Sequence, residues 1–249
     1  MGFRELLKKT AHAVSPRQRT TALILAAGSG TRFGERKQFT EILGVPVLLR
    51  TVLTFDACPL IDEVIVVTGE EDIEPCRELL GDGIGKLTKI VVGGATRQES
   101  AMAGLEALDA KSDFIAIHDA ARCLVTVDMI EKVLREAYET GAAAAAERAV
   151  DTVKYADANG VITDTIDRDH VWLMKTPQIF NANMYRAAVY SAYKDKVSVT
   201  DDCMLVERLG FKIKAVDCGR ENIKLTYAED KIIAEAILSS REKRKDSEE

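Results

Sequence analysis

Short apolar runs alternate with helix-like segments along the chain up to residue 140. The apolar runs are rich in Val, Ile and Leu and cover residues 23–26, 64–67, 90–92 and 114–117. Apolar residues at helical spacing lie near residues 46–57, 71–80, 97–108 and 127–140. Strands that alternate with helices build parallel sheets. The pattern therefore predicts an α/β fold with a doubly wound, mostly parallel sheet.

The pattern changes after residue 141. An alanine run at 142–146 predicts a buried strand, and short strands are expected at 151–155, 161–165 and 171–174, with a turn at 157–160. Because hairpins do not continue a strand–helix–strand unit, residues 148–175 are expected to form a β-arm off the main sheet. The remaining predicted elements are helices at 182–193 and 201–208, a strand at 212–217 and a helix opened by a capping box of Thr226 and Glu229.

Both ends of the chain differ from its centre. Residues 1–20 form an N-terminal extension in which Phe3, Leu6 and Leu7 share helical spacing among basic residues. Such a segment can rest on a membrane surface or a partner, although a loosely docked extension is the commoner case. Residues 241–249 carry mixed charge and no apolar side chain, which predicts a solvated tail. Residues 21–240 are expected to form a single domain.

Composition narrows the class of protein. The net charge of −6 argues against a general nucleic-acid binder. No apolar run reaches the roughly 18 residues that span a bilayer, and the start of the chain lacks the apolar region of a secretory signal. The cysteines are scattered without a CxxC pair, and the histidines lie far apart, so no zinc pattern is present. We expect a cytoplasmic protein with reduced thiols.

A loop of small residues after the first predicted strand is the most informative chemical feature. The loop consists of Ala26, Ala27, Gly28, Ser29, Gly30 and Thr31. Small side chains let backbone N–H groups approach an anion closely, and Arg32 and Lys37 add full positive charges. The glycine spacing matches neither a Walker loop nor a dinucleotide fingerprint. The loop predicts a triphosphate site; the alternative is a flexible glycine-rich surface loop.

Two further loops, at 93–100 and 118–122, also follow predicted strands and should meet the first at one sheet edge. Asp119 could hold Mg²⁺ beside a triphosphate, or could equally be a helix N-cap. Gly94, Ala95 and Ser100 could lie against a flat base, in a turn that also carries a capping box. Arg122 could bind a second phosphate, whereas His118 is more simply a packed strand residue.

Eight motifs together resemble one enzyme family. They are LAAGSGTRFG…KQF, GGATRQESAMAGL, HDAAR, DTVK, TIDR, TPQIF, VTDD and ENIKLT, in this order across residues 21–238. The chain resembles the 2-C-methyl-D-erythritol 4-phosphate cytidylyltransferases of the non-mevalonate isoprenoid pathway, which have a Rossmann-like nucleotidyltransferase fold. The sister ribitol-5-phosphate cytidylyltransferases typically carry HDSVRP-like sequence in place of HDAAR, which favours the erythritol family.

The resemblance implies a role for each matching residue. The CTP phosphates would be bound by the backbone of 26–31 with Arg32 and Lys37, the cytosine by Gly94, Ala95 and Ser100, and the ribose by Ala120 and Ala121. Mg²⁺ would be held by Asp119, with Glu221 as a second ligand. The acceptor and its attacking oxygen would be surrounded by Arg122, Asp151, Thr152, Thr165, Thr200 and the catalytic Lys224.

The resemblance also implies an activity and an assembly. The enzyme would transfer CMP from CTP to a polyol phosphate and release pyrophosphate, as a homodimer whose β-arm reaches the neighbour's site. Arg36, Cys123 and Val150 depart from the family pattern. The resemblance therefore predicts the acceptor contacts less completely than the nucleotide contacts. The alternatives are a ribitol-5-phosphate cytidylyltransferase, a sugar-1-phosphate nucleotidyltransferase and a non-catalytic nucleotide sensor.

Overall fold

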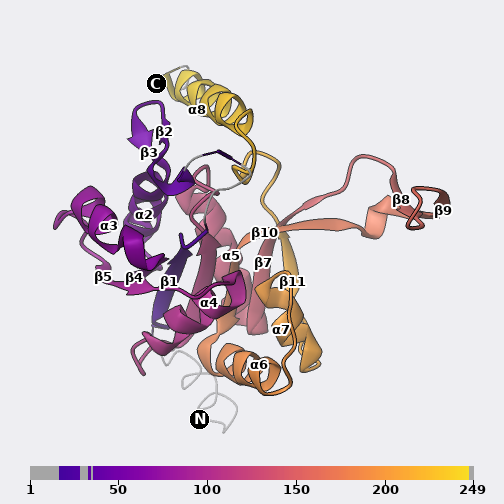
Figure 1. Cartoon of the computed structure of the whole chain (residues 1–249), viewed down its shortest axis with the longest axis horizontal. Coiled ribbons are helices and arrows are strands. Elements are labelled where there is room, and N and C mark those ends of the chain that lie inside the picture. Colours follow the sequence, from indigo (N-terminus) through magenta and orange to yellow (C-terminus); the bar gives the residue numbers. More distant parts are fainter. Residues whose placement is uncertain (1–16, 29–32, 35, 247–249) are drawn as a thin grey trace, which may run out of the picture.

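The computed structural model describes residues 17–28, 33–34 and 36–246. Its centre is a seven-stranded sheet in the order β11-β7-β10-β6-β1-β4-β5 (Figure 1). The strands are β1 (Thr20–Leu25), β4 (Glu63–Thr68), β5 (Leu87–Val92), β6 (Phe114–Asp119), β7 (Ala142–Arg148), β10 (Trp172–Asn181) and β11 (Lys214–Asp217). Only β10 runs antiparallel to its neighbours in this sheet, so the predicted mostly parallel α/β fold is confirmed.

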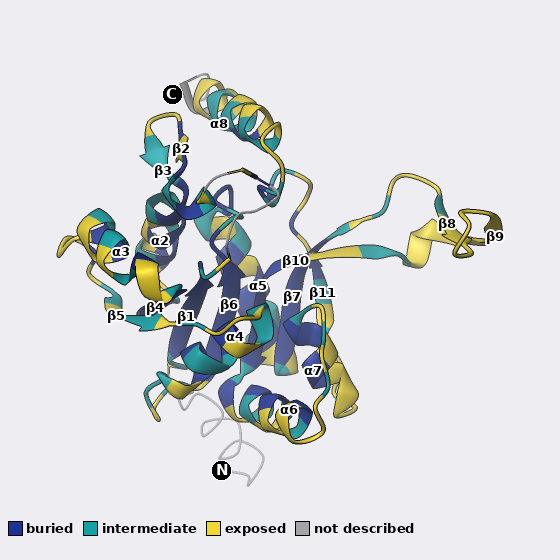
Figure 2. Cartoon of the chain, in the orientation of Figure 1, coloured by how far each residue is buried: buried dark blue, intermediate teal, exposed yellow. Residues whose placement is uncertain are grey.

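Helices cover both faces of the sheet because its strands bury side chains on both sides. In β1, Ala22 and Ile24 belong to one apolar core and Leu23 and Leu25 to the other. The first core packs α2 (Val47–Ala57), α3 (Ile73–Leu80) and α5 (Val127–Thr140) against the sheet. The second packs α4 (Arg97–Glu106), α6 (Ala182–Lys194) and α7 (Asp202–Arg208). The central strands are accordingly dark in Figure 2.

The alanine run is the buried strand that the sequence predicts. Residues 142–146 of β7 are all fully buried. Ala142 and Ala144 share a core with Phe180 and Tyr185, whose rings stack 5.3 Å apart. Small side chains on β7 thus make room for large ones on β10 and α6. The free thiols of all five cysteines are also buried.

A β-arm projects from one end of the sheet, as predicted (Figure 1). Its outer part is a hairpin of β8 (Val153–Ala156) and β9 (Ile162–Ile166), followed by the short helix η3 (Arg168–His170). At its root, the Arg148 guanidinium lies 4.5 Å from the Trp172 ring centroid. The expected strand at 171–174 continues as β10 to Asn181, because this strand also pairs with β6 and β7 in the main sheet.

One expectation for the C-terminal part is wrong. The capping box of Thr226 and Glu229 is not formed; instead, the Asp230 carboxylate accepts the N–H groups of Thr226 at 2.6 Å and Tyr227 at 2.8 Å, and α8 (Asp230–Asp246) begins there. The first capping box, between Thr96 and Glu99, is confirmed. The segment expected as a solvated tail is exposed at residues 242–244 and continues α8 as far as residue 246, with Arg241 and Arg244 paired to Glu221.

Smaller elements complete the chain. They are η1 (Lys37–Phe39), β2 (Glu41–Ile42), β3 (Val45–Pro46) and η2 (Glu70–Asp72). Of the N-terminal extension, residues 1–16 lie outside the described residues, and Thr20 already belongs to β1. In the part of the chain that the structure describes, each helix is too short or too polar to cross a bilayer.

Candidate active site

A cavity of about 440 Å³ lies at the carboxyl edge of the parallel strands. The three loops singled out in the sequence converge there, as expected for loops that follow neighbouring parallel strands. The cavity is lined by Leu25, Ala26, Ala27, Gly28, Lys37, Gln38, Gly94, Ala95, Thr96, Arg97, Ser100, Asp119, Ala120, Ala121 and Lys224. Ser29, Gly30, Thr31 and Arg32 lie outside the described residues.

Asp119, the last residue of β6, is held between two cations. The Arg97 Nε donates to Asp119 Oδ1 at 3.0 Å, and the Lys224 Nζ lies 2.6 Å from Oδ2. Burial alone would raise the pKa of Asp119, but Arg97 and Lys224 hold it well below its usual range. The carboxylate is therefore ionised at neutral pH.

Lys37 reaches the cavity from η1. Its Nζ donates to the Leu225 carbonyl at 3.2 Å, and that residue directly follows Lys224 in the chain. The next residue, Gln38, is buried and donates to Asp72 Oδ2 at 2.8 Å, which anchors η1. Arg36 pairs with the same Asp72 carboxylate at 2.6 Å. Arg36 is thus engaged outside the cavity, whereas Lys37 lines it.

The loop after β5 is shaped by close packing. A Cβ built on Gly94 would lie 2.3 Å from the Glu99 Cβ, so glycine is needed beside the capping box. Ser100 is 3% exposed, and its Oγ donates to the Thr96 carbonyl at 2.9 Å. A hydroxyl that donates still has lone pairs to accept a hydrogen bond. The Ser100 oxygen can therefore act as an acceptor at the cavity wall.

Behind Asp119 lies a buried polar layer that includes Thr176 of β10. The Thr176 Oγ1 accepts the Asp119 N–H at 3.1 Å and is hydrogen-bonded to His118 Nδ1 at 3.1 Å. Burial lowers the pKa of His118 to about 3, so the ring is neutral and packed, as the simpler interpretation held. The Arg122 Nη1 donates to the Asn222 carbonyl at 3.0 Å, and Arg122 lies outside the cavity lining.

Apart from Lys224, the residues that the resemblance places around the acceptor do not line the cavity within one chain. Asp151 and Thr152 lie at the start of the arm and Thr165 in β9, where its Oγ1 accepts from Lys154 Nζ at 2.6 Å. The Thr200 hydroxyl contacts the Met204 sulfur at 3.1 Å.

Glu221 is not placed as a metal ligand. One carboxylate oxygen lies 2.7 Å from Arg241 Nε and the other 2.9 Å from Arg244 Nη2, both on α8. These hydrogen bonds lower the pKa of Glu221. The residue lies outside the cavity lining, and we replace the expectation of a second ligand with a structural role in holding α8.

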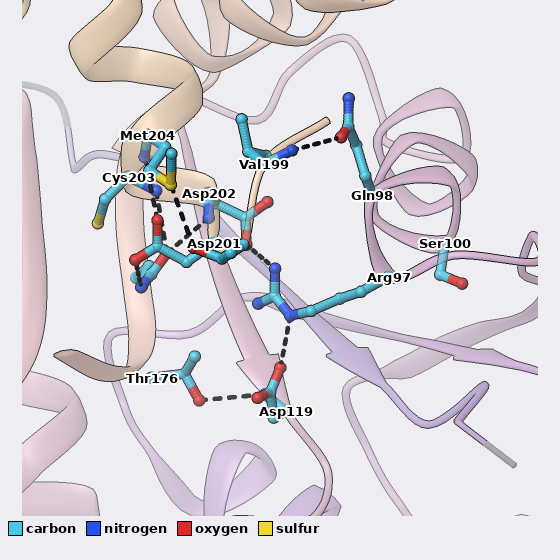
Figure 3. A network of polar contacts seen from close by, with 12 residues as sticks. Arg97, Gln98, Ser100, Asp119, Thr176, Val199, Asp201, Asp202, Cys203 and Met204 are labelled. Atoms are coloured by element: carbon cyan, nitrogen blue, oxygen red, sulfur yellow. Dashed lines mark hydrogen bonds and ion pairs between the residues drawn. The ribbon is translucent and has the colours of Figure 1, made fainter. Parts of the chain in front are cut away.

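The sequence pattern assigned no role to Arg97, which the structure places in the cavity wall. It lines the cavity, lies 28% exposed at its side chain and contacts two carboxylates, those of Asp119 and Asp202 (Figure 3). A signal was present: Arg97 opens α4, and a cation is unfavourable at a helix N-terminus unless a carboxylate compensates for it.

The fold and the site define the class of this protein. A loop of small residues, two lysines and an ionised aspartate meet at the carboxyl edge of a mostly parallel sheet. This combination is that of a nucleotidyltransferase. A model of the family "IspD: 2-C-methyl-D-erythritol 4-phosphate cytidylyltransferase" matches residues 20–240. The chain belongs to this family.

Relatives and solved structures agree with this assignment. The chain is 40% identical over 229 residues to the 2-C-methyl-D-erythritol 4-phosphate cytidylyltransferase of Symbiobacterium thermophilum, covering 91% of this chain and 96% of the relative. A similar structure is 4-diphosphocytidyl-2C-methyl-D-erythritol synthase from Anaerococcus prevotii, with 32% identity, a TM-score of 0.82 and coverage of 89% and 96%. The Francisella tularensis enzyme has 28% identity, a TM-score of 0.76 and coverage of 88% and 100%. The predicted resemblance is confirmed.

Proposed function

We propose that this protein transfers CMP from CTP to 2-C-methyl-D-erythritol 4-phosphate and releases pyrophosphate, in isoprenoid precursor biosynthesis. The observation that carries the proposal is the cavity in which Lys37, Lys224 and Asp119 meet the small-residue loop. The family membership of the chain favours this acceptor over ribitol 5-phosphate.

The chemistry follows from the charges in the cavity. An oxygen of the acceptor phosphate attacks the α-phosphorus of CTP, and the bond from that phosphorus to the β-bridging oxygen breaks. Pyrophosphate leaves with the electron pair. The attacking oxygen is already ionised, so positioning and charge neutralisation supply the catalysis. Lys37 and Lys224 stabilise the charge on the phosphates, together with Arg32, for which we retain this role as a proposal.

Asp119 fits a single Mg²⁺ ligand. Its carboxylate is ionised, and among the described residues that line the cavity Asp119 is the one with an acidic side chain. Mg²⁺ prefers one or two carboxylates together with phosphate oxygens and water. When bound, the ion would neutralise phosphate charge. In the same complex Lys224 would leave Asp119 Oδ2 for a phosphate oxygen, and its half-exposed side chain permits this movement.

The direct test is pyrophosphate release from CTP with each acceptor. We expect turnover with 2-C-methyl-D-erythritol 4-phosphate and little with ribitol 5-phosphate. A preference for ribitol 5-phosphate would assign the chain to the sister activity. CTP binding without turnover on either acceptor would favour a nucleotide sensor.

The base wall leads to a second prediction. Gly94, Ala95 and Ser100 line the cavity with Ala120 and Ala121. We assign the first three to a cytosine-sized base and the two alanines to the ribose, so a purine should be excluded by size. Buried polar groups left unpaired by the wrong base are also costly. We expect CTP to be turned over at least on the order of 10²-fold faster than ATP, and faster than UTP, in the same assay. Equal rates with ATP would contradict the role given to this loop.

We further propose a cytoplasmic homodimer joined through the arm. The side chains of Tyr155, Val161 and Ile162 are 60%, 60% and 61% exposed near the hairpin end, which is yellow in Figure 2. A two-stranded hairpin is marginally stable alone, and a two-fold dimer is the commonest way to bury such a surface. The arm residues Asp151, Thr152 and Thr165 would then complete the neighbour's acceptor site, with Thr200 and Arg122 nearby.

Subunit mixing tests this shared site. Lys37→Ala and Thr165→Ala, each inactive as a homodimer, should recover activity after subunit exchange, up to about a quarter of the wild-type level for random pairing. The matched control mixes Lys37→Ala with Lys224→Ala, two residues of one chain's cavity, and should recover none. A fully active monomer in light scattering would contradict the proposal.

A further inference from the structure

Arg97 bridges two carboxylates on different elements of the fold. Its Nε lies 3.0 Å from Asp119 Oδ1, and its Nη1 lies 2.6 Å from Asp202 Oδ2 (Figure 3). Asp202 is 1% exposed and lies at the start of α7. Burial alone would lower the pKa of Arg97, but Asp202 and Asp119 together raise it, so the guanidinium stays charged.

Asp202 is itself held in place. The Tyr185 hydroxyl donates to Asp202 Oδ1 at 2.6 Å, and the Asp202 N–H donates to Gln178 Oε1 at 3.0 Å. Tyr185 is fully buried in α6. Asp202, whose carboxylate pairs with Arg97, is therefore anchored to both α6 and β10.

This anchoring limits how Arg97 meets Asp119. A free guanidinium tends to bind a carboxylate through two parallel N–H···O bonds. Here Asp202 occupies Nη1, which excludes the end-on pair of Nη1 and Nη2 bonds to Asp119, and Arg97 contacts Asp119 through Nε at Oδ1. The other oxygen, Oδ2, faces Lys224, whose side chain is 38% exposed and can move. The negative charges of Asp119 and Asp202 balance the positive charges of Arg97 and Lys224.

We propose that Asp202, anchored by Tyr185, is a positioning residue that keeps Arg97 on one oxygen of Asp119 and leaves the other for a divalent cation bound with CTP. The inference rests on the proposed function and concerns which oxygen of Asp119 stays available to the cation. Without the Asp202 charge, Arg97 would close on both Asp119 oxygens and compete with the cation.

Calorimetric titration of CTP in Mg²⁺ and in EDTA measures this directly, without turnover. The ratio of the two affinities reports how strongly the cation and the nucleotide are coupled. We expect Asp202→Asn to lower this ratio about tenfold. The matched control, Glu207→Gln, removes an exposed charge from the same helix and should leave the ratio unchanged. An unchanged ratio in Asp202→Asn overturns the inference.

A double variant separates positioning from simple loss of structure. In Arg97→Gln/Asp202→Asn the competing guanidinium is absent, so the ratio should rise at least about threefold above that of Asp202→Asn. A double variant no better than the single one overturns the inference. If Asp202→Asn does not fold, as judged by thermal melting, Tyr185→Phe replaces it, with an expected fall of about threefold, and no fall overturns the inference.

The wild-type titration distinguishes the inference from the proposed function. If CTP does not bind to the wild-type protein in Mg²⁺, the proposed function fails. If CTP binds equally well in Mg²⁺ and in EDTA, Asp119 does not hold the cation and the positioning role of Asp202 is overturned, whereas CTP recognition stands.

Discussion

Asp119→Asn is expected to abolish Mg²⁺-dependent turnover while leaving a folded protein. The amide keeps the size of the side chain but removes the charge that a divalent cation requires. We expect a loss of at least about 10³ in the rate of pyrophosphate release, measured with Mg²⁺ and with EDTA. The melting temperature should fall as well, because Arg97 and Lys224 both lose an ion pair at a buried carboxylate.

A second strand-end aspartate provides the control. Asp217 ends β11, and its carboxylate accepts the Gly219 N–H at 2.9 Å, outside the cavity. Asp217→Asn should keep near wild-type turnover. If the wild-type enzyme were equally active in EDTA, Asp119 would have a role other than that of a metal ligand.

Lys37→Ala is expected to lower turnover by about 10²–10³, the usual effect of removing one preorganised charge contact from a transition state. The fold should survive, since Lys37 lies on a three-residue helix at the cavity rim and is not among the buried residues of the apolar core. We expect the same loss for Arg32→Ala, whose side chain lies outside the described residues. Steady-state pyrophosphate release measures both variants.

The neighbouring cation is a matched control for Lys37. Arg36 lies one residue earlier but pairs with Glu71 at 3.0 Å and Asp72 at 2.6 Å, away from the cavity. Arg36→Ala should therefore change turnover by less than about threefold, with any cost appearing in stability. Near wild-type turnover in Lys37→Ala would remove this lysine from the proposed machinery.

Much of the site followed from local pattern. The loop after β1 and the loop of Gly94 and Ser100 follow strands that the apolar runs predict, and Asp119 ends another such strand. Carboxyl ends of neighbouring parallel strands lie at one sheet edge, so the meeting of these loops needed no knowledge of distant contacts. The Thr96 capping box and the arm hairpin were predictable for the same reason, because their signals span a few residues.

Contacts between distant segments had no such signal. Arg97 and Asp202 are separated by 105 residues. Glu221 pairs with Arg241 of α8, a residue in the segment that the sequence predicts to be a solvated tail. The pattern of charges along the chain does not state which carboxylate will face which guanidinium. That pairing depends on how α4, α7 and α8 pack against the rest of the fold.

The sequence by itself thus determined the strand–helix alternation, the arm and the meeting of the loops that follow β1, β5 and β6 at one sheet edge. Tertiary structure alone decided that β10 enters the sheet antiparallel, that Asp119 lies between Arg97 and Lys224, and that Glu221 serves α8. The reason is physical: periodicity and turn chemistry act between residues close in sequence, whereas ion pairing in a buried site depends on burial and distance, which only the packed chain defines.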